Sequence, residues 1–230
     1  GSEMCIRDRD NTILKDQLNL MRVGEPMYVF YGYVEDGYDE NGHIVYKNMD
    51  DDPAITAADK TIIGDPNPDF LVNLTTAVSY KGFTLSAFFQ SSIGNDIYSL
   101  SMAAQAYDYG YNGNTLREVY YNHWTPENPT AKYPNLDQTS YKMSDRFVYD
   151  GSFVRLKNLE LAYDVPCARS KFIKRARVYV SAQNLFTITS YPFWDPDINA
   201  NGGGSSMIQG VDSYCYPSAR TYTIGCRLTF

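Results

Sequence analysis

The sequence predicts an all-β fold that forms part of a transmembrane β-barrel, and three observations lead to that prediction. Stretches of roughly nine to twelve residues alternate between apolar and polar side chains, which is the pattern of strands with one face in an apolar medium. Long and short connections between these stretches alternate strictly, as they do in outer-membrane barrels. Helical periodicity is weak after residue 22.

The last stretch, "RTYTIGCRLTF" at 220–230, has the clearest alternation. Small, polar or charged residues fall on one face: Thr221, Thr223, Gly225, Arg227 and Thr229. Apolar or aromatic residues fall on the other: Tyr222, Ile224, Cys226, Leu228 and Phe230. A charge such as Arg227 is tolerated on the lumen face of a barrel, so we expect the apolar set to face lipid.

Five further stretches are β-branched or aromatic, or alternate in the same way. A two-residue "KG" at 81–82 between two of them predicts a tight hairpin. The alternation slips near Lys157 and Asn158, which predicts a β-bulge. The expected strands lie near 26–34, 70–80, 83–94, 153–163, 176–189 and 219–230.

The connections between these strands differ greatly in length. The short ones are expected at one end of the barrel and the long ones, on the extracellular side, at the other. The short connections are 81–82 and 164–175, and the long ones are 35–69, 95–152 and 190–218.

About six antiparallel strands cannot close a membrane barrel, because known ones start at about eight. Open edges in lipid would leave backbone groups unpaired at several kcal/mol each. We therefore expect the C-terminal portion of a larger barrel. A soluble β-sandwich that binds carbohydrate through tyrosine-rich loops would also alternate, but it accounts less readily for strands this long and for long loops at one end only.

Composition excludes several other classes. A net charge of −7 argues against a nucleic-acid partner, which would need a basic face. The four cysteines have no C-x-x-C spacing, so a zinc or redox motif is not expected. No apolar run is long enough for a transmembrane helix. Residues 1–9, "GSEMCIRDR", resemble translated adapter sequence, so we treat them as an artefactual leader and 10–230 as the partial barrel.

Several blocks of the sequence, in order and with matching spacing, closely resemble one family. It is the C-terminal part of the SusC/RagA-type TonB-dependent outer-membrane transporters of Bacteroidetes. The blocks are "GDPNPDF", "SYKGFTLSAFFQSSIGNDIY", "HWTPENPTAKYP", "SDRFVYDGSFVRLKNLELAYDVP", "ARVYVSAQNLFTIT" and "RTYTIGCRLTF".

This resemblance implies a barrel of about 22 strands with an N-terminal plug, embedded in the outer membrane. It implies import of glycans or peptides with a SusD-like lipoprotein lid, using energy passed from TonB. Plug, TonB contact and most strands would lie upstream of this chain. The aromatic end at Phe230 resembles the signal that the barrel-assembly machinery reads.

An acidic loop, "NMDDDPAITAAD" at 48–59, has the spacing of a calcium loop. Ligands at positions one, three, five and twelve would be Asn48, Asp50, Asp52 and Asp59. Pro53 stands at position six, where the sharp turn needs glycine, so a solvated acidic loop is the alternative. No other cofactor is expected.

Aromatic residues gather in the stretch 104–124, where we expect contact with substrate or partner. The candidates are Tyr107, Tyr109, Tyr111 and Trp124, although such side chains also serve to fold a loop or to form an interfacial girdle. The stretch 191–206 is a second candidate.

The sequence holds no recognisable catalytic constellation. His43 and His123 fall in different loops without a matching nucleophile or metal partner, and nothing pairs the many carboxylates. Nucleophile-elbow, P-loop and dinucleotide motifs are also missing from the sequence. We therefore expect a protein that is not an enzyme.

Overall fold

The computed structural model describes residues 12–15, 18–107, 114–138, 140–167, 172–198 and 209–230. Its residues divide into two compact units. The sheet unit comprises Pro68–Gly94, Gly151–Asp197 and Tyr216–Phe230. The loop unit comprises Gly1–Asn67, Asn95–Asp150 and Ile198–Cys215. Residues 1–9, Tyr109 and Tyr111, about which the sequence led to predictions, lie outside the described residues.

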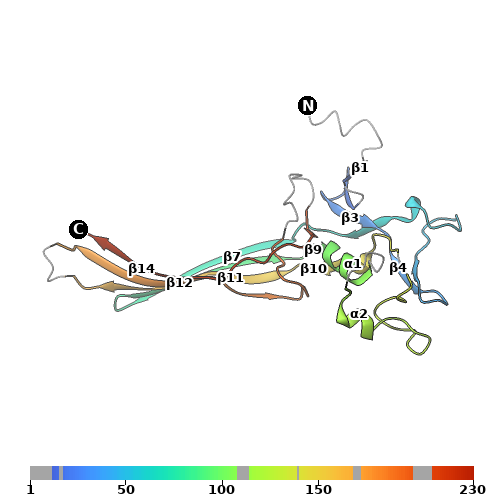
Figure 1. Ribbon diagram of the computed structural model, residues 1–230. Helices are drawn as coiled ribbons and strands as arrows, with labels where there is room; N and C mark the ends of the chain where they lie inside the picture. Colours follow the sequence, from blue (N-terminus) through green and yellow to red (C-terminus); the bar gives the residue numbers. More distant parts are fainter. Residues whose placement is uncertain (1–11, 16–17, 108–113, 139, 168–171, 199–208) are drawn as a thin grey trace. The chain divides into compact units, whose positions relative to one another are not determined.

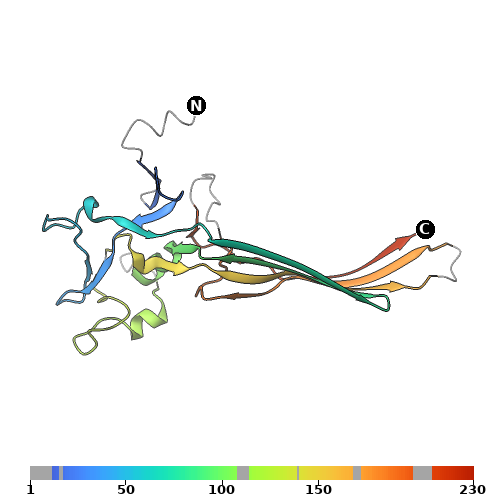
Figure 2. The same ribbon diagram turned by 180° about the vertical axis from the view of Figure 1, so that it is seen from behind.

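The sheet unit contains one five-stranded antiparallel sheet in the order β14-β12-β11-β8-β7. Each of these five strands pairs with the one of the five that follows it in the sequence. Figure 1 shows these long strands side by side, and Figure 2 shows the same arrangement from behind. The strands are β7 (Phe70–Tyr80), β8 (Phe83–Ile93), β11 (Phe153–Val165), β12 (Arg175–Thr189) and β14 (Thr221–Thr229).

Local details of this sheet agree with the sequence pattern. Lys81 and Gly82 both have positive φ, at 47° and 85°, as a two-residue hairpin turn requires. The pairing of β11 with both neighbours shifts register between Leu156 and Asn158, where the alternation slips. Expected and observed strand ends in this sheet differ by at most two residues.

The two faces of the sheet differ in chemistry from edge to edge. Residues directly opposite in an antiparallel pair share a face, so the register assigns every side chain. One row across the sheet joins Val78, Leu85, Leu161, Val180 and Ile224. A neighbouring row on the other face joins Ala77, Ser86, Glu160, Ser181 and Thr223. We call these the apolar face and the polar face.

The apolar face is open in the described structure. Val78 is 65% exposed and Ile224 is 84% exposed. A β-sandwich would cover such a face with a second sheet, but the described part of the sheet unit contains one sheet only. Contiguous apolar surface of this extent marks a site of contact with protein or membrane.

A large and a small residue face each other on the polar face between β12 and β14. Tyr179 lies directly opposite Gly225, and a Cβ atom at Gly225 would be 2.5 Å from the ring of Tyr179. The glycine therefore leaves the space that the tyrosine ring fills.

The loop unit holds short strands and helices, most of them in the segments expected as the long loops 35–69 and 95–152. Apart from the strand within 26–34, these strands were not expected, because alternation over two to four residues is too short to be recognised. They are β1 (Thr12–Lys15), β2 (Asn19–Arg22), β3 (Val29–Gly32), β4 (Glu35–Tyr38), β5 (Ile44–Tyr46), β6 (Thr61–Gly64), β9 (Asp96–Ser99), β10 (Val148–Asp150) and β13 (Val211–Asp212).

The expected long strand at 26–34 requires a correction. Only β3 forms within it, and β3 pairs with β2 and β6 in a separate small sheet. Tyr28, with φ of 64°, interrupts the extended backbone just before β3. Among the described residues, the sheet of long strands therefore has five strands rather than about six.

Aromatic side chains form the core of the loop unit. Tyr98 packs against Phe30 and Phe147 with ring centroids 5.8 and 5.9 Å apart, and all three side chains are buried. Helical segments are short: α1 (Leu100–Tyr107), α2 (Arg117–Tyr121), η1 (Ala57–Asp59) and η2 (Asp145–Phe147). Within the described ranges, no helix is long and apolar enough to cross a membrane.

Candidate functional site

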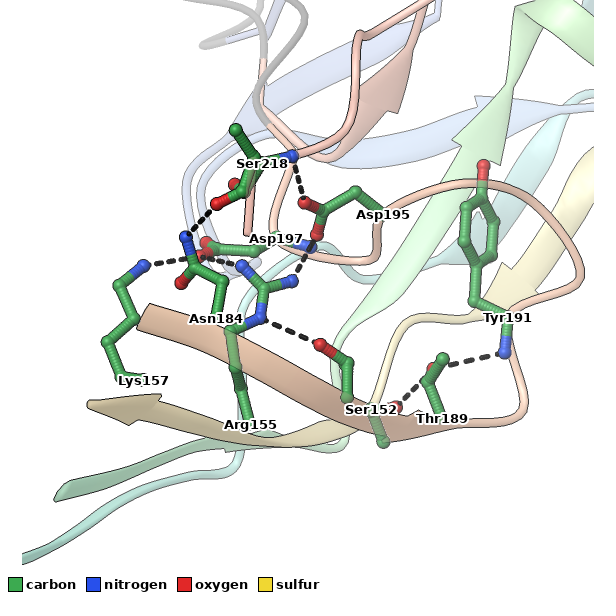
Figure 3. Close-up of polar contacts among 11 residues, drawn as sticks. Ser152, Arg155, Lys157, Asn184, Thr189, Tyr191, Asp195, Asp197 and Ser218 are labelled. Carbon is green, nitrogen blue, oxygen red and sulfur yellow. Dashed lines mark hydrogen bonds and ion pairs between the residues drawn. The ribbon is translucent and has the colours of Figure 1, made fainter. Parts of the chain in front are cut away.

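A buried arginine on the polar face is the centre of a polar network in the sheet unit (Figure 3). Arg155 of β11 is 1% exposed. Its Nε donates to Oγ1 of Thr187, the residue directly opposite on β12, at 2.9 Å. Its other nitrogens bind Asp195 and, at 3.3 Å, Asp197. Arg155 thereby ties the segment after β12 to the sheet.

Asp195 joins the two ends of the connection between β12 and β14. Its carboxylate accepts hydrogen bonds from the backbone N–H of Ser218 at 2.9 Å and of Asp197 at 3.0 Å, in addition to Arg155. Burial by itself raises the pKa of Asp195, but these donors outweigh it and hold the pKa below its ordinary value. The carboxylate is therefore ionised and fully engaged at neutral pH.

The neighbouring residues extend this network along the sheet. Lys157, at the bulge, lies 3.7 Å from Asp197. The Thr189 hydroxyl donates to the backbone carbonyl of Ser152 at 2.8 Å and accepts from the N–H of Tyr191 at 3.1 Å (Figure 3). These bonds fix the backbone where β12 ends and the connection begins.

A cleft of about 430 Å³ opens beside the network. Its walls come from β11, β12, the segment after β12 and the segment before β14. Among its lining residues are Arg155, Asn184, Thr187, Trp194, Asp195 and Arg220. We call it the Arg155 cleft.

The acidic loop at 48–59 folds through its own side chains. The oxygens of Asn48, Asp50 and Asp52 each accept from the backbone N–H two residues ahead, at 2.9–3.1 Å. Asp59 is buried and accepts from the N–H groups of Met49 and Thr56, each at 2.7 Å. These bonds, from Met49 first, lower the pKa of Asp59.

The four calcium candidates thus bind backbone N–H groups of their own loop. Within the described residues, no group of three or more His, Cys, Asp or Glu side chains is placed to hold a metal ion. Calcium binding at the loop stays a prediction from its spacing.

The aromatic candidates separate in the structure. Tyr107 is the last residue of α1. Trp124 is partly buried and lies against Gly42, at the turn before β5, so closely that no side chain would fit there. Trp124 therefore helps to fold the loop unit, which is the alternative considered for these aromatics.

Several exposed aromatic side chains are not among these candidates. Trp194 is 71% exposed and lines the Arg155 cleft. Tyr120 and Tyr121 of α2 are both exposed, with ring centroids 5.3 Å apart. Trp194 falls within the second candidate stretch, 191–206, but no spacing in the sequence singles it out. Phe230 directly follows β14 and is exposed.

Comparison with known proteins gives related sequences over most of this chain. No protein-family model matches it. TonB-dependent receptor P3 of Formosa agariphila is 32% identical over 251 aligned positions, which cover 100% of this chain and 25% of that protein. TonB-dependent receptor SusC of Bacteroides thetaiotaomicron is 30% identical, over 91% of this chain and 20% of that protein.

Solved structures give the same relationship. The RagAB peptide importer in the "closed-closed" state matches 95% of this chain and 24% of the compared chain, with a TM-score of 0.79 and 26% identity. Its "open-open" state matches with a TM-score of 0.76 and 25% identity. The chain spans about a quarter of the length of these relatives, and its five-stranded sheet corresponds to a partial barrel. By sequence and by fold, the chain is related to the SusC/RagA-type TonB-dependent receptors and corresponds to part of such a protein.

Proposed function

We propose that this chain is a wall section, with its loops, of a TonB-dependent importer in the outer membrane. The observation that carries the proposal is the sheet with one open apolar face and one polar face. Its strands of 9 to 15 residues are long enough to cross a bilayer when tilted. In this role the apolar face contacts lipid and the polar face lines the lumen.

The distribution of charge supports this orientation. Charged side chains of the long strands, among them Arg155, Glu160, Asp164, Arg177 and Arg227, share the polar face. Arg177 lies 3.6 Å from Asp164, directly opposite, and 3.8 Å from Glu160. A charge on the lipid face of a barrel costs about 2–4 kcal/mol at the bilayer midplane, whereas lumen charges tune selectivity.

The cargo in this proposal is a glycan or an oligopeptide, taken up together with a SusD-like lipoprotein. The relatives support it by name, since one is a SusC receptor and another is a peptide importer. TonB would act through a part of the protein outside this chain, and the barrel-assembly machinery would insert the barrel. None of the named relatives is an enzyme, which fits a positional rather than a catalytic role.

Cysteine labelling of the full-length protein tests the orientation of the sheet. Cys226 is exposed on the apolar face, and Thr223 lies on the polar face of the same strand. With the other cysteines replaced by serine, Cys226 should react with a lipid-soluble maleimide and resist a membrane-impermeant one. A Thr223→Cys variant without Cys226 should show the reverse preference.

Fractionation provides the second readout. The full-length protein should be recovered in outer membranes and should change mobility on a gel after heating. A folded, soluble protein, or rapid labelling of Cys226 by the impermeant reagent, would contradict the proposal. Growth of a deletion strain on glycans and on peptides as sole carbon source would then separate the two classes of cargo.

A further inference from the structure

We infer that the Arg155 cleft binds an acidic oligosaccharide, through carboxylate or sulfate groups beside an aromatic platform. The chemistry of the ligand is derived from the cleft itself. That the ligand is a cargo in transit rests on the proposed function. The cleft volume of about 430 Å³ lies within the range of small-ligand pockets.

The buried pair Arg155 and Asp195 forms part of the wall of the cleft. Arg155 has donors engaged with Thr187, Asp195 and Asp197, and Asp195 accepts from three donors. Both side chains are buried, at 1% and 6% exposure. Three of the five N–H donors of Arg155 are engaged inside the protein, so we assign the main ligand contacts to the other, more exposed lining residues.

Most of the remaining polar groups can donate hydrogen bonds, and one of them, Oδ1 of Asn184, is a buried acceptor without a partner among the described residues. Arg220 is exposed and forms no ion pair with any described residue. The Thr187 oxygen accepts from Arg155, which leaves its own proton for another acceptor. Trp194 is largely exposed and carries an indole N–H, a donor only. A ligand that fits must supply acceptors for these donors and a donor for Asn184, as a sugar carrying both hydroxyl and acidic groups does.

The charge around the cleft selects an anion. Of the lining residues, Arg155 and Arg220 contribute two positive charges and Asp195 one negative charge, a net of +1. Lys157 and Asp197, outside the lining, add one charge of each sign. The carboxylates are paired with Arg155 and Lys157, so the unpaired charge is Arg220. A guanidinium binds a carboxylate or sulfate through two parallel N–H bonds.

The aromatic wall favours a sugar over a peptide. Phe193 packs edge-on against the buried Tyr191 with centroids 5.3 Å apart, which supports the segment carrying Trp194. An exposed indole face can cover the C–H face of a sugar ring and remove that apolar surface from water. The sugar hydroxyls then meet the donors at the rim. An extended peptide would instead gain most from backbone hydrogen bonds to a strand edge.

The test uses the full-length protein in detergent, titrated with tetragalacturonate and followed by calorimetry. We expect binding that weakens as salt is added, and much weaker binding of the neutral maltotetraose. Arg220→Gln and Trp194→Ala should each lower the affinity for tetragalacturonate at least about tenfold, which corresponds to 1.4 kcal/mol. Arg227→Gln, in β14 and outside the lining of the cleft, should leave affinity unchanged.

Gel mobility before and after heating confirms that each variant is folded, and Arg220→Lys, which keeps the charge, should retain part of the affinity. The inference is overturned if tetragalacturonate does not bind. It is also overturned if neither cleft variant changes its affinity, or if tetraglutamate binds more tightly at the same residues. Binding in detergent does not depend on localisation or transport, so this result stands apart from the fractionation test.

Discussion

At the scale of single residues, the most constrained group is the pair Arg155 and Asp195. The two are 40 positions apart, and no local pattern links them. Arg155 alternates correctly with its neighbours as a polar-face residue, so the sequence predicts its face. Its burial depends on the connection between β12 and β14, which folds back over β11. Sequence periodicity carries no information on the path of that connection.

Replacing Arg155 by methionine should destabilise the sheet unit strongly, because Asp195 would stay buried without its cation. The expected loss in free energy of unfolding is about 3–5 kcal/mol, as for other broken buried pairs. Heat- or urea-induced loss of the folded gel band of the full-length protein measures it. Lys157→Ala, at a half-exposed ion pair, should cost less than about 1 kcal/mol.

The double variant Arg155→Met with Asp195→Leu separates pairing from packing. Removing both charges should recover most of the lost stability, since an apolar pair of similar volume often replaces a buried ion pair well. A double variant as unstable as the single one would show that pairing is not the cause.

Gly225 is a second residue whose role is steric. Gly225→Ala should destabilise the protein by about 1–3 kcal/mol, because the new methyl group overlaps the ring of Tyr179. Adding Tyr179→Ser should relieve the overlap, and thermal unfolding of the four proteins of this cycle measures the coupling. Thr223→Ala, two residues away on the same face, is the control and should have little effect.

Asp59 predicts a pH dependence of the acidic loop. Its pKa is lowered in the folded protein, so its ionised form stabilises the loop above the ordinary value of about 4. That stabilisation is lost as the pH falls below this value. Hydrogen-exchange protection of the Met49 and Thr56 amides, corrected for intrinsic rates, should therefore decrease between about pH 5 and pH 3.

Variants of the loop provide the contrast. Asp59→Asn should lower protection at neutral pH and remove the decrease at acid pH, whereas Asp51→Asn should change neither. Asp51 is exposed, and its side chain makes no hydrogen bond with any described residue. Unchanged protection in Asp59→Asn would mean that the carboxylate does not hold the loop.

At the scale of elements, strands were predictable where alternation extends over nine or more residues. β7, β8, β12 and β14 each repeat the pattern over many positions, and the bulge in β11 is visible as a slip in phase. The short strands of the loop unit depend on partners remote in sequence, such as β13 against β9. Aromatic and β-branched composition at 26–34 favoured a long strand, but composition does not set strand length.

β14 offers a matched test of its two faces. Ile224→Arg puts a charge on the apolar face and should cost about 2–4 kcal/mol of stability in the membrane. Thr223→Arg puts the same charge on the polar face and should be nearly neutral. Unfolding of the purified barrel in lipid vesicles measures both, and equal effects would contradict the assignment of faces.

At the scale of the whole molecule, the barrel relationship was accessible from sequence because it rests on many ordered blocks. The division into two units was not, since it follows from how distant segments cluster. The Arg155 cleft was likewise invisible, because strands and connections far apart in the chain supply its walls.

Assembly of the full-length protein should depend on Phe230. Phe230→Asp in the full-length protein should lower its level in outer membranes several-fold, if the barrel-assembly machinery reads this residue. Immunoblots of fractionated membranes measure the level, with Thr229→Asp, one residue earlier on the polar face, as the control. Normal levels of the Phe230 variant would refute the role of this residue.

The two-residue turn at Lys81 and Gly82 affects the order in which the long strands pair during folding. It joins two strands that pair along all eleven positions of each, so this hairpin needs no distant segment to form. Isolated hairpins form in about 1–10 μs, far faster than contacts that must first close a long loop. We therefore expect β7 and β8 to pair with each other before β11 pairs with β8.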